Sequence, residues 1–80
     1  MYTTYILKSA KDGKYYYGSC EDLEKRLTMH NGGKVRSTKS RIPFIVIYKE
    51  VYETRSEAQK REYYFKSIDG YIWLKENSII

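Results

Sequence analysis

The stretch Tyr15–Cys20 and the segment after it hold the side chains of this sequence that are best suited to chemistry. Three tyrosines run into Gly18, and Arg26 follows on the next predicted element. A phenol can hydrogen-bond or move a proton, bare glycine backbone allows close approach, and a guanidinium can hold an anion through two parallel hydrogen bonds. Because a strand would end and a helix begin here, Tyr16, Gly18 and Arg26 surround one corner. We interpret that corner as a site.

Two further titratable residues lie on the predicted helices. His30 follows Arg26 at helical spacing, so both share one face. A histidine at a helix end is also a common helix-dipole partner. Glu62 stands between Ala58 and Phe65 on an apolar helical stripe, where a carboxylate is costly unless it is paired or coordinated. The open alternatives for Glu62 are a metal-ligand role and an ion pair with Arg55, Arg61, Lys66 or Arg26.

The elements that position these residues begin with a predicted hairpin. Residues 2–9 are rich in aromatic and β-branched types and predict a strand, and Asp12-Gly13 predicts the turn before the tyrosine run. This hairpin would bring Tyr5 close to Tyr16. A helix is expected over 21–30, started by a Ser19 cap and stopped by Asn31-Gly32-Gly33.

The second half predicts a loop, a strand and two helices. Residues 31–41 read as a basic loop, and the very apolar residues 42–52 predict the buried central strand. Thr54 and Glu57 match a capping box for a helix over 56–67. A final short helix is expected after Asp69-Gly70.

Length and composition predict one domain over residues 1–80. The single cysteine, Cys20, has no internal disulfide partner, and the sequence shows neither a leader nor a long apolar run. These features predict a reduced, cytoplasmic protein that does not contact a membrane. A monomer is expected rather than an oligomer, with a protein partner left open.

Positive charge is concentrated in the middle of the chain. The net charge is +5, yet no acidic residue occurs between Glu24 and Glu50. This segregation is typical of a surface that binds a polyanion such as nucleic acid, although a solvated basic loop is the plain alternative. The residues expected to contact nucleic acid are Gly18, Ser19, Lys34, Arg36, Lys39 and Arg41.

The ordered set of motifs resembles the GIY-YIG nuclease superfamily, in particular its small stand-alone members, and is distantly similar to the N-terminal nuclease domain of UvrC. The set comprises Tyr5, Tyr16-x-Gly18, Asp22-Leu23-Glu24-x-Arg26-Leu27-x-x-His30-Asn31, the basic loop, Tyr48-x-Glu50 and Thr54-Arg55-x-Glu57-Ala58-x-x-x-Glu62. The first signature reads Thr3-Thr4-Tyr5 in place of Gly-Ile-Tyr. The resemblance spans essentially the whole chain.

The resemblance implies an α+β fold, with a three-stranded antiparallel sheet flanked by helices in the order strand, strand, helix, strand, helix, helix. It also implies metal-dependent phosphodiester cleavage. The catalytic residues carried over from the family are Tyr5, Tyr16, Arg26, His30 and Glu62, with Glu62 as the metal ligand.

The chemistry of these residues supports a specific hypothesis. Glu62 would hold one Mg²⁺ or Mn²⁺, since a lone carboxylate suits these ions better than Zn²⁺. Arg26 would hold the scissile phosphate, and Tyr16 would act as general base, with Tyr5 and His30 assisting. A free phenol has a pKa near ~10, so a nearby cation is needed.

These residues predict an endonuclease that acts on DNA at branched, damaged or single-stranded structures, as in DNA repair. The alternative is a nucleic-acid-binding module of the same fold with weak or lost catalysis. A structural domain with a protein partner is the third possibility.

Overall fold

The sheet is built around the first strand of the chain, β1 (Tyr2–Ser9). It pairs antiparallel with β2 (Tyr15–Cys20) on one side and with β3 (Phe44–Tyr52) on the other, so the strand order is β2-β1-β3. The computed structural model describes residues 1–80, and the Asp12-Gly13 turn forms as predicted, with Gly13 at a φ of 71°.

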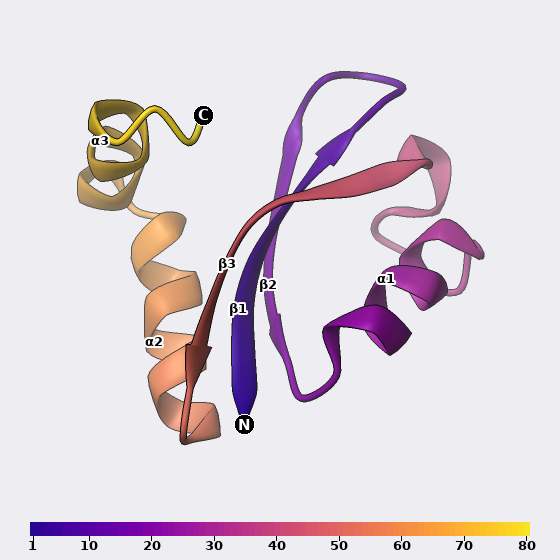
Figure 1. Cartoon of the computed structure of the whole chain (residues 1–80). Coiled ribbons are helices and arrows are strands. Elements are labelled where there is room, and N and C mark those ends of the chain that lie inside the picture. Colours follow the sequence, from indigo (N-terminus) through magenta and orange to yellow (C-terminus); the bar gives the residue numbers. More distant parts are fainter.

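Helices cover both faces of this sheet. Helix α1 (Leu23–Asn31) lies on one face, and α2 (Arg55–Phe65) and α3 (Ile68–Glu76) lie on the other (Figure 1). A short 3-10 helix (Lys39–Arg41) interrupts the predicted basic loop. The α+β class and the order of elements implied by the resemblance are confirmed.

The expectation that residues 42–52 form the central strand is wrong. β3 is an edge strand, where Ile45 remains 59% exposed and Val51 51% exposed. The central strand is β1, in which every residue from Thr3 to Leu7 is buried. A strand is buried when it has a neighbouring strand on each side and helices on both faces of the sheet. Its apolar content alone does not determine its position in the sheet.

The expected Ser19 cap is also wrong. Ser19 is still part of β2, paired with Thr4, and its side chain cannot reach the first turn of α1. Asp22 caps that helix by accepting a hydrogen bond from the backbone N–H of Lys25 at 3.1 Å. The helix ends at Asn31 with Gly32 as its C-cap, which confirms the predicted stop.

The two C-terminal helices begin at side-chain caps. Thr54 and Glu57 form the predicted capping box at the start of α2. α3 starts earlier than predicted, because Ser67 caps it through the N–H of Gly70 at 3.1 Å and brings Asp69 into its first turn. Gly70 lies so close to the backbone of Tyr64 that a Cβ atom would overlap it.

Two small apolar clusters share the sheet. Tyr5, Leu7, Cys20 and Phe44 are buried on the α1 face, and Ile6, Phe65 and Leu74 are buried on the α2 face. Successive residues of a strand point to opposite faces, so Tyr5 and Leu7 belong to the first cluster and Ile6, which lies between them on β1, belongs to the second.

None of the helices has the length and the apolar character needed to cross a bilayer.

Candidate active site

The register of the hairpin stacks two tyrosine rings on the α1 face of the sheet. Tyr5 pairs with Gly18, and Leu7 pairs with Tyr16, so the two phenols come from neighbouring strands. Their ring centroids are 6.4 Å apart with an interplanar angle of 25°. The predicted closeness of Tyr5 and Tyr16 is therefore confirmed.

Gly18 leaves the space that the Tyr5 ring fills. A Cβ atom at position 18 would overlap the Tyr5 hydroxyl and lie 2.5 Å from its Cζ atom. A side chain here would push Tyr5 out of its position against Tyr16. In this structure the side chain of Tyr5 makes the close approach to the backbone that Gly18 permits.

His30 connects the tyrosine pair to α1. Its side chain is fully buried, and its Nε2 atom lies 3.2 Å from the Tyr5 hydroxyl. The imidazole also packs edge-on against Tyr16, with ring centroids 4.9 Å apart. Burial, and then the positive charge of Arg26, lower the pKa of His30, so the ring is neutral at neutral pH.

Tyr5 is held in its protonated form. Its side chain is 1% exposed, and burial, followed by the effect of a charge on Tyr16, raises the pKa of Tyr5 well above its ordinary value. The charge of Arg26 opposes this rise without cancelling it. Tyr5 is thus a hydrogen-bond donor near neutral pH.

Arg26 supplies positive charge beside this cluster. It lies one turn before His30 on α1, is half-buried and makes no ion pair. Its side chain lines an open cavity of about 500 Å³. The other lining residues are Cys20, Glu21, Asp22, Lys25 and Met29. An unpaired guanidinium in an open cavity can bind an anionic group from solution.

Glu62 approaches from the opposite helix layer. It lies on α2, and the hydroxyl of Ser19 donates to its Oε1 atom at 2.7 Å. Ser19 points away from the face that carries Tyr16, so Glu62 meets the edge of β2 from the other side. Its negative charge nevertheless contributes to the raised pKa of Tyr5.

The Glu62 carboxylate has a second partner, Lys66, whose ammonium nitrogen lies 2.8 Å from Oε2. No group of three His, Cys, Asp or Glu side chains gathers anywhere in the structure. One hard carboxylate fits Mg²⁺ or Mn²⁺ where waters and substrate phosphates complete the shell. Such an ion would share the carboxylate with Ser19 and Lys66.

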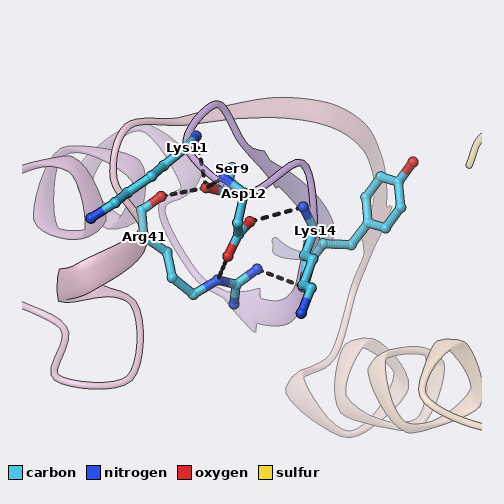
Figure 2. Close-up of polar contacts among 6 residues, drawn as sticks. Ser9, Lys11, Asp12, Lys14 and Arg41 are labelled. Carbon is cyan, nitrogen blue, oxygen red and sulfur yellow. Dashed lines mark hydrogen bonds and ion pairs between the residues drawn. The ribbon is translucent and has the colours of Figure 1, made fainter.

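The cations of the basic loop differ in whether they form an ion pair. Lys34, Arg36 and Lys39 are exposed and form no ion pair. The guanidinium of Arg41 donates to Asp12 at 2.9 Å (Figure 2). It also donates to the carbonyl oxygen of Tyr15 at 3.3 Å. Arg41 therefore fastens the loop to the hairpin.

Ser9 and Asp12 complete this attachment. The Ser9 hydroxyl donates to the carbonyl oxygen of Arg41 at 2.5 Å and accepts from the N–H groups of Lys11 and Asp12. Asp12 accepts from the N–H of Lys14 at 2.9 Å as well as from Arg41, as Figure 2 shows. The turn and the loop consequently form one hydrogen-bonded unit.

Thr38 belongs to the group formed by Tyr5, Tyr16 and His30, although the sequence placed it only within the predicted basic loop over residues 31–41. It is fully buried, and its Oγ1 atom lies 2.8 Å from Nδ1 of His30. A threonine in a polar loop carries no periodic signal that would separate an inward hydroxyl from an outward one. Only the tertiary structure identifies it.

Comparison with known proteins identifies the family of this chain. The family model described as the GIY-YIG catalytic domain matches residues 1–70. The chain is 47% identical over 64 residues to a UPF0213 protein of Staphylococcus saprophyticus, covering 79% of this chain and 77% of that protein. It is 41% identical to the UPF0213 protein YazA of Bacillus subtilis, covering 92% of this chain and 80% of that protein.

A solved structure shares the fold. The solution NMR structure of the UPF0213 protein BH0048 from Bacillus halodurans matches with a TM-score of 0.55 and 31% sequence identity. The match covers 95% of this chain and 84% of that one.

Proposed function

We propose, from the premise that this chain belongs to the GIY-YIG catalytic domain family, that it is an endonuclease which hydrolyses phosphodiester bonds in DNA with a divalent metal ion. The observation that supports this most is the gathering of Tyr5, Tyr16 and His30 on one face of the sheet. Arg26 lies one turn before His30 on α1, and its charge affects both Tyr5 and His30. Exposed cations of the basic loop follow directly after α1 on the chain.

The proposed roles follow from how exposed and how charged each group is. Tyr16 is only half-buried, so its hydroxyl is within reach of solvent. As general base it would first give its own proton to solvent and then take a proton from the attacking water. The water oxygen then bonds to phosphorus as the bond to the leaving oxygen breaks, and that oxygen is protonated by solvent. Arg26 holds the phosphoryl oxygens and neutralises the charge that develops on them.

Tyr5 and His30 act from inside the protein. Both are buried, so they hold Tyr16 in place through ring packing and the hydrogen bond between them. Glu62 would hold Mg²⁺ or Mn²⁺. When bound, such an ion would supply charge neutralisation for phosphodiester cleavage.

The substrates we propose are branched, damaged or single-stranded DNA. Lys34, Arg36 and Lys39 contact the phosphate backbone, which carries no sequence information. Recognition would then follow the shape of the substrate rather than its base sequence. Residues 1–80 then act as one nuclease domain.

The test is a nicking assay on supercoiled plasmid and on flapped, branched and single-stranded oligonucleotides, with Mg²⁺, Mn²⁺ or chelator. Tyr16→Phe should lower the rate by about 100-fold or more, the usual range for losing a general base. Glu62→Gln, which removes the proposed metal ligand, should abolish the nicking that depends on Mg²⁺ or Mn²⁺. The circular dichroism spectrum should not change.

Matched controls come from neighbouring positions. Tyr15→Phe changes a tyrosine on the opposite face of β2, and Glu53→Gln changes an exposed carboxylate, so both should keep full activity. Full activity in Tyr16→Phe would refute its role. If the unaltered protein binds DNA without nicking it under any condition, the binding-module alternative holds.

A further inference from the structure

Thr38 lies at the end of a buried chain of polar groups. Its Oγ1 atom is 2.8 Å from Nδ1 of His30 and 3.4 Å from the carbonyl oxygen of Val35. At the other side of the imidazole, Nε2 is 3.2 Å from the Tyr5 hydroxyl. Thr38, His30 and Tyr5 are each at most 1% exposed, so water does not supply alternative partners.

The partners fix the direction of these hydrogen bonds. The carbonyl oxygen of Val35 can only accept, so the Thr38 hydroxyl donates to it. Thr38 then accepts from Nδ1–H of His30. A neutral imidazole carries one N–H, so Nε2 is bare and accepts the Tyr5 hydroxyl proton.

The other tautomer of His30, with the proton on Nε2, leaves a hydrogen-bond donor without a partner. If Nε2 carried the proton, it would donate to Tyr5, and the Tyr5 hydrogen would have no acceptor in the structure. A buried donor without a partner destabilises the fold, because it has lost its hydrogen bond to water without replacing it. Burial and Arg26 also lower the pKa of His30, which keeps the imidazole neutral and the chain directional.

We propose that Thr38 is a positioning residue: by accepting from Nδ1 it sets the tautomer of His30 and thereby holds the Tyr5 phenol against Tyr16. Its consequence for catalysis rests on the nuclease function proposed above. Thr38 also lies between Arg36 and Lys39. The loop that would contact phosphate is thus joined to the tyrosine pair by hydrogen bonds.

The tautomer is measured directly by nitrogen-15 NMR of the His30 imidazole in the full chain, which contains no other histidine. The unaltered protein should show a protonated Nδ1 and a bare Nε2. Thr38→Val keeps the shape and removes the acceptor, so the proton should move largely to Nε2. Thr38→Ser should keep the original tautomer, and Ser37→Ala, on the exposed neighbour, should change nothing.

The kinetic parameters of the Thr38 variants distinguish a positioning role from a purely structural one. Thr38→Val should lower kcat for nicking by about 10- to 100-fold, with KM nearly unchanged, because a small displacement of a reacting group has effects of this size. Thr38→Ser should restore kcat to within about twofold, since it keeps the hydroxyl oxygen.

Two results would overturn the proposal: a proton on Nε2 in the unaltered protein, or an unchanged tautomer in Thr38→Val. The first requires no variant, so it applies even if Thr38→Val fails to fold. If the tautomer is as expected but the protein nicks no substrate, the positioning role of Thr38 is supported and the nuclease function is refuted.

Discussion

Tyr5 and Tyr16 have the same side chain and different environments. Tyr5 sits on the central strand over Gly18, with 1% of its surface exposed and a raised pKa, so it donates a hydrogen bond and does not ionise near neutral pH. Tyr16 sits on the edge strand and stays half-buried. The edge position is what makes Tyr16 the accessible phenol of the pair.

His30 gives the stability of the fold a predictable pH dependence. Its pKa is lowered in the folded state by burial and by Arg26, and Tyr5 and Thr38 face its two nitrogens. Below the unfolded pKa of about 6.5, the unfolded chain binds a proton that the folded chain resists. The free energy of unfolding should therefore fall as the pH drops from 7.5 to 5.5, by at most about 1.4 kcal/mol per pH unit.

Urea unfolding at several pH values measures this slope. His30→Gln should be less stable overall but should lose the slope between pH 7.5 and 5.5, because the chain has no other histidine. The carboxylates titrate mainly below this window. An equal slope in both proteins would mean that His30 is not the group responsible.

At the scale of elements, the position of Glu62 depends on how α2 is fixed to the sheet. Arg61, next to Glu62 on α2, donates to both carboxylate oxygens of Glu50 on β3, at 2.8 and 3.3 Å. The phenols of Tyr48 and Tyr52 also donate to Glu50. Burial alone would raise the pKa of Glu50, but these hydrogen bonds outweigh it and lower the pKa below its ordinary value.

The same guanidinium stacks on aromatic rings. Arg61 lies 4.8 Å from the centroid of Phe65 and 4.5 Å from that of Trp73. One side chain therefore joins β3, α2 and α3. Burial, followed by the hydrogen bond to Glu50, raises the pKa of Tyr48 to about 12, which keeps this phenol a donor to the carboxylate.

A double-mutant cycle tests this junction. Arg61→Ala and Glu50→Ala should each destabilise the protein, and the coupling energy between them should be about 1–3 kcal/mol, because the pair is partly buried and bidentate. Arg61→Lys should not restore the loss, since an ammonium lacks the fork.

Denaturant unfolding of the four proteins gives the coupling energy. The pair formed by Asp12 and Arg41, whose carboxylate is more exposed than that of Glu50, provides the comparison, and its coupling energy should be smaller. Additive effects of Arg61→Ala and Glu50→Ala would show that the two side chains stabilise the fold independently.

At the scale of the whole molecule, the basic side chains of residues 31–41 are either exposed and unpaired or held in an ion pair. Lys34, Arg36 and Lys39 are exposed and unpaired, whereas Arg41 is held by Asp12 and lies 5.3 Å from the ring centroid of Phe44. The first three remain available to a polyanion. Arg41 contributes mainly to the structure of the loop.

The salt dependence of DNA binding should reflect this division. Replacing Lys34, Arg36 and Lys39 by Gln should reduce the slope of log affinity against log salt by about 2–3, close to 0.9 for each lost phosphate contact. Binding is measured by fluorescence anisotropy with a duplex at several salt concentrations.

The controls lie on the other side of the molecule. Lys60→Gln and Lys75→Gln, on α2 and α3, should leave the slope unchanged. Arg41→Gln should lower the free energy of unfolding with a smaller effect on the slope. A triple variant that keeps the full slope would place the DNA elsewhere on the surface.

Local rules account for much of the fold. The Asp12-Gly13 turn, the Thr54 and Glu57 capping box and the Gly32 stop were all predictable, because each depends on residues near one another in the chain. The ordered motif set predicted the family, and the predicted hairpin placed Tyr5 close to Tyr16.

The remaining features depend on contacts between distant segments. The order of the strands in the sheet made β1 the central strand. Ser19 stays in β2 and donates a hydrogen bond to Glu62, and Arg41 forms an ion pair with Asp12. The sequence by itself determined which local elements form and which reactive side chains they carry. Only the tertiary structure decided which hydroxyls and charges face inward, because burial and pairing depend on what the other elements place against each residue.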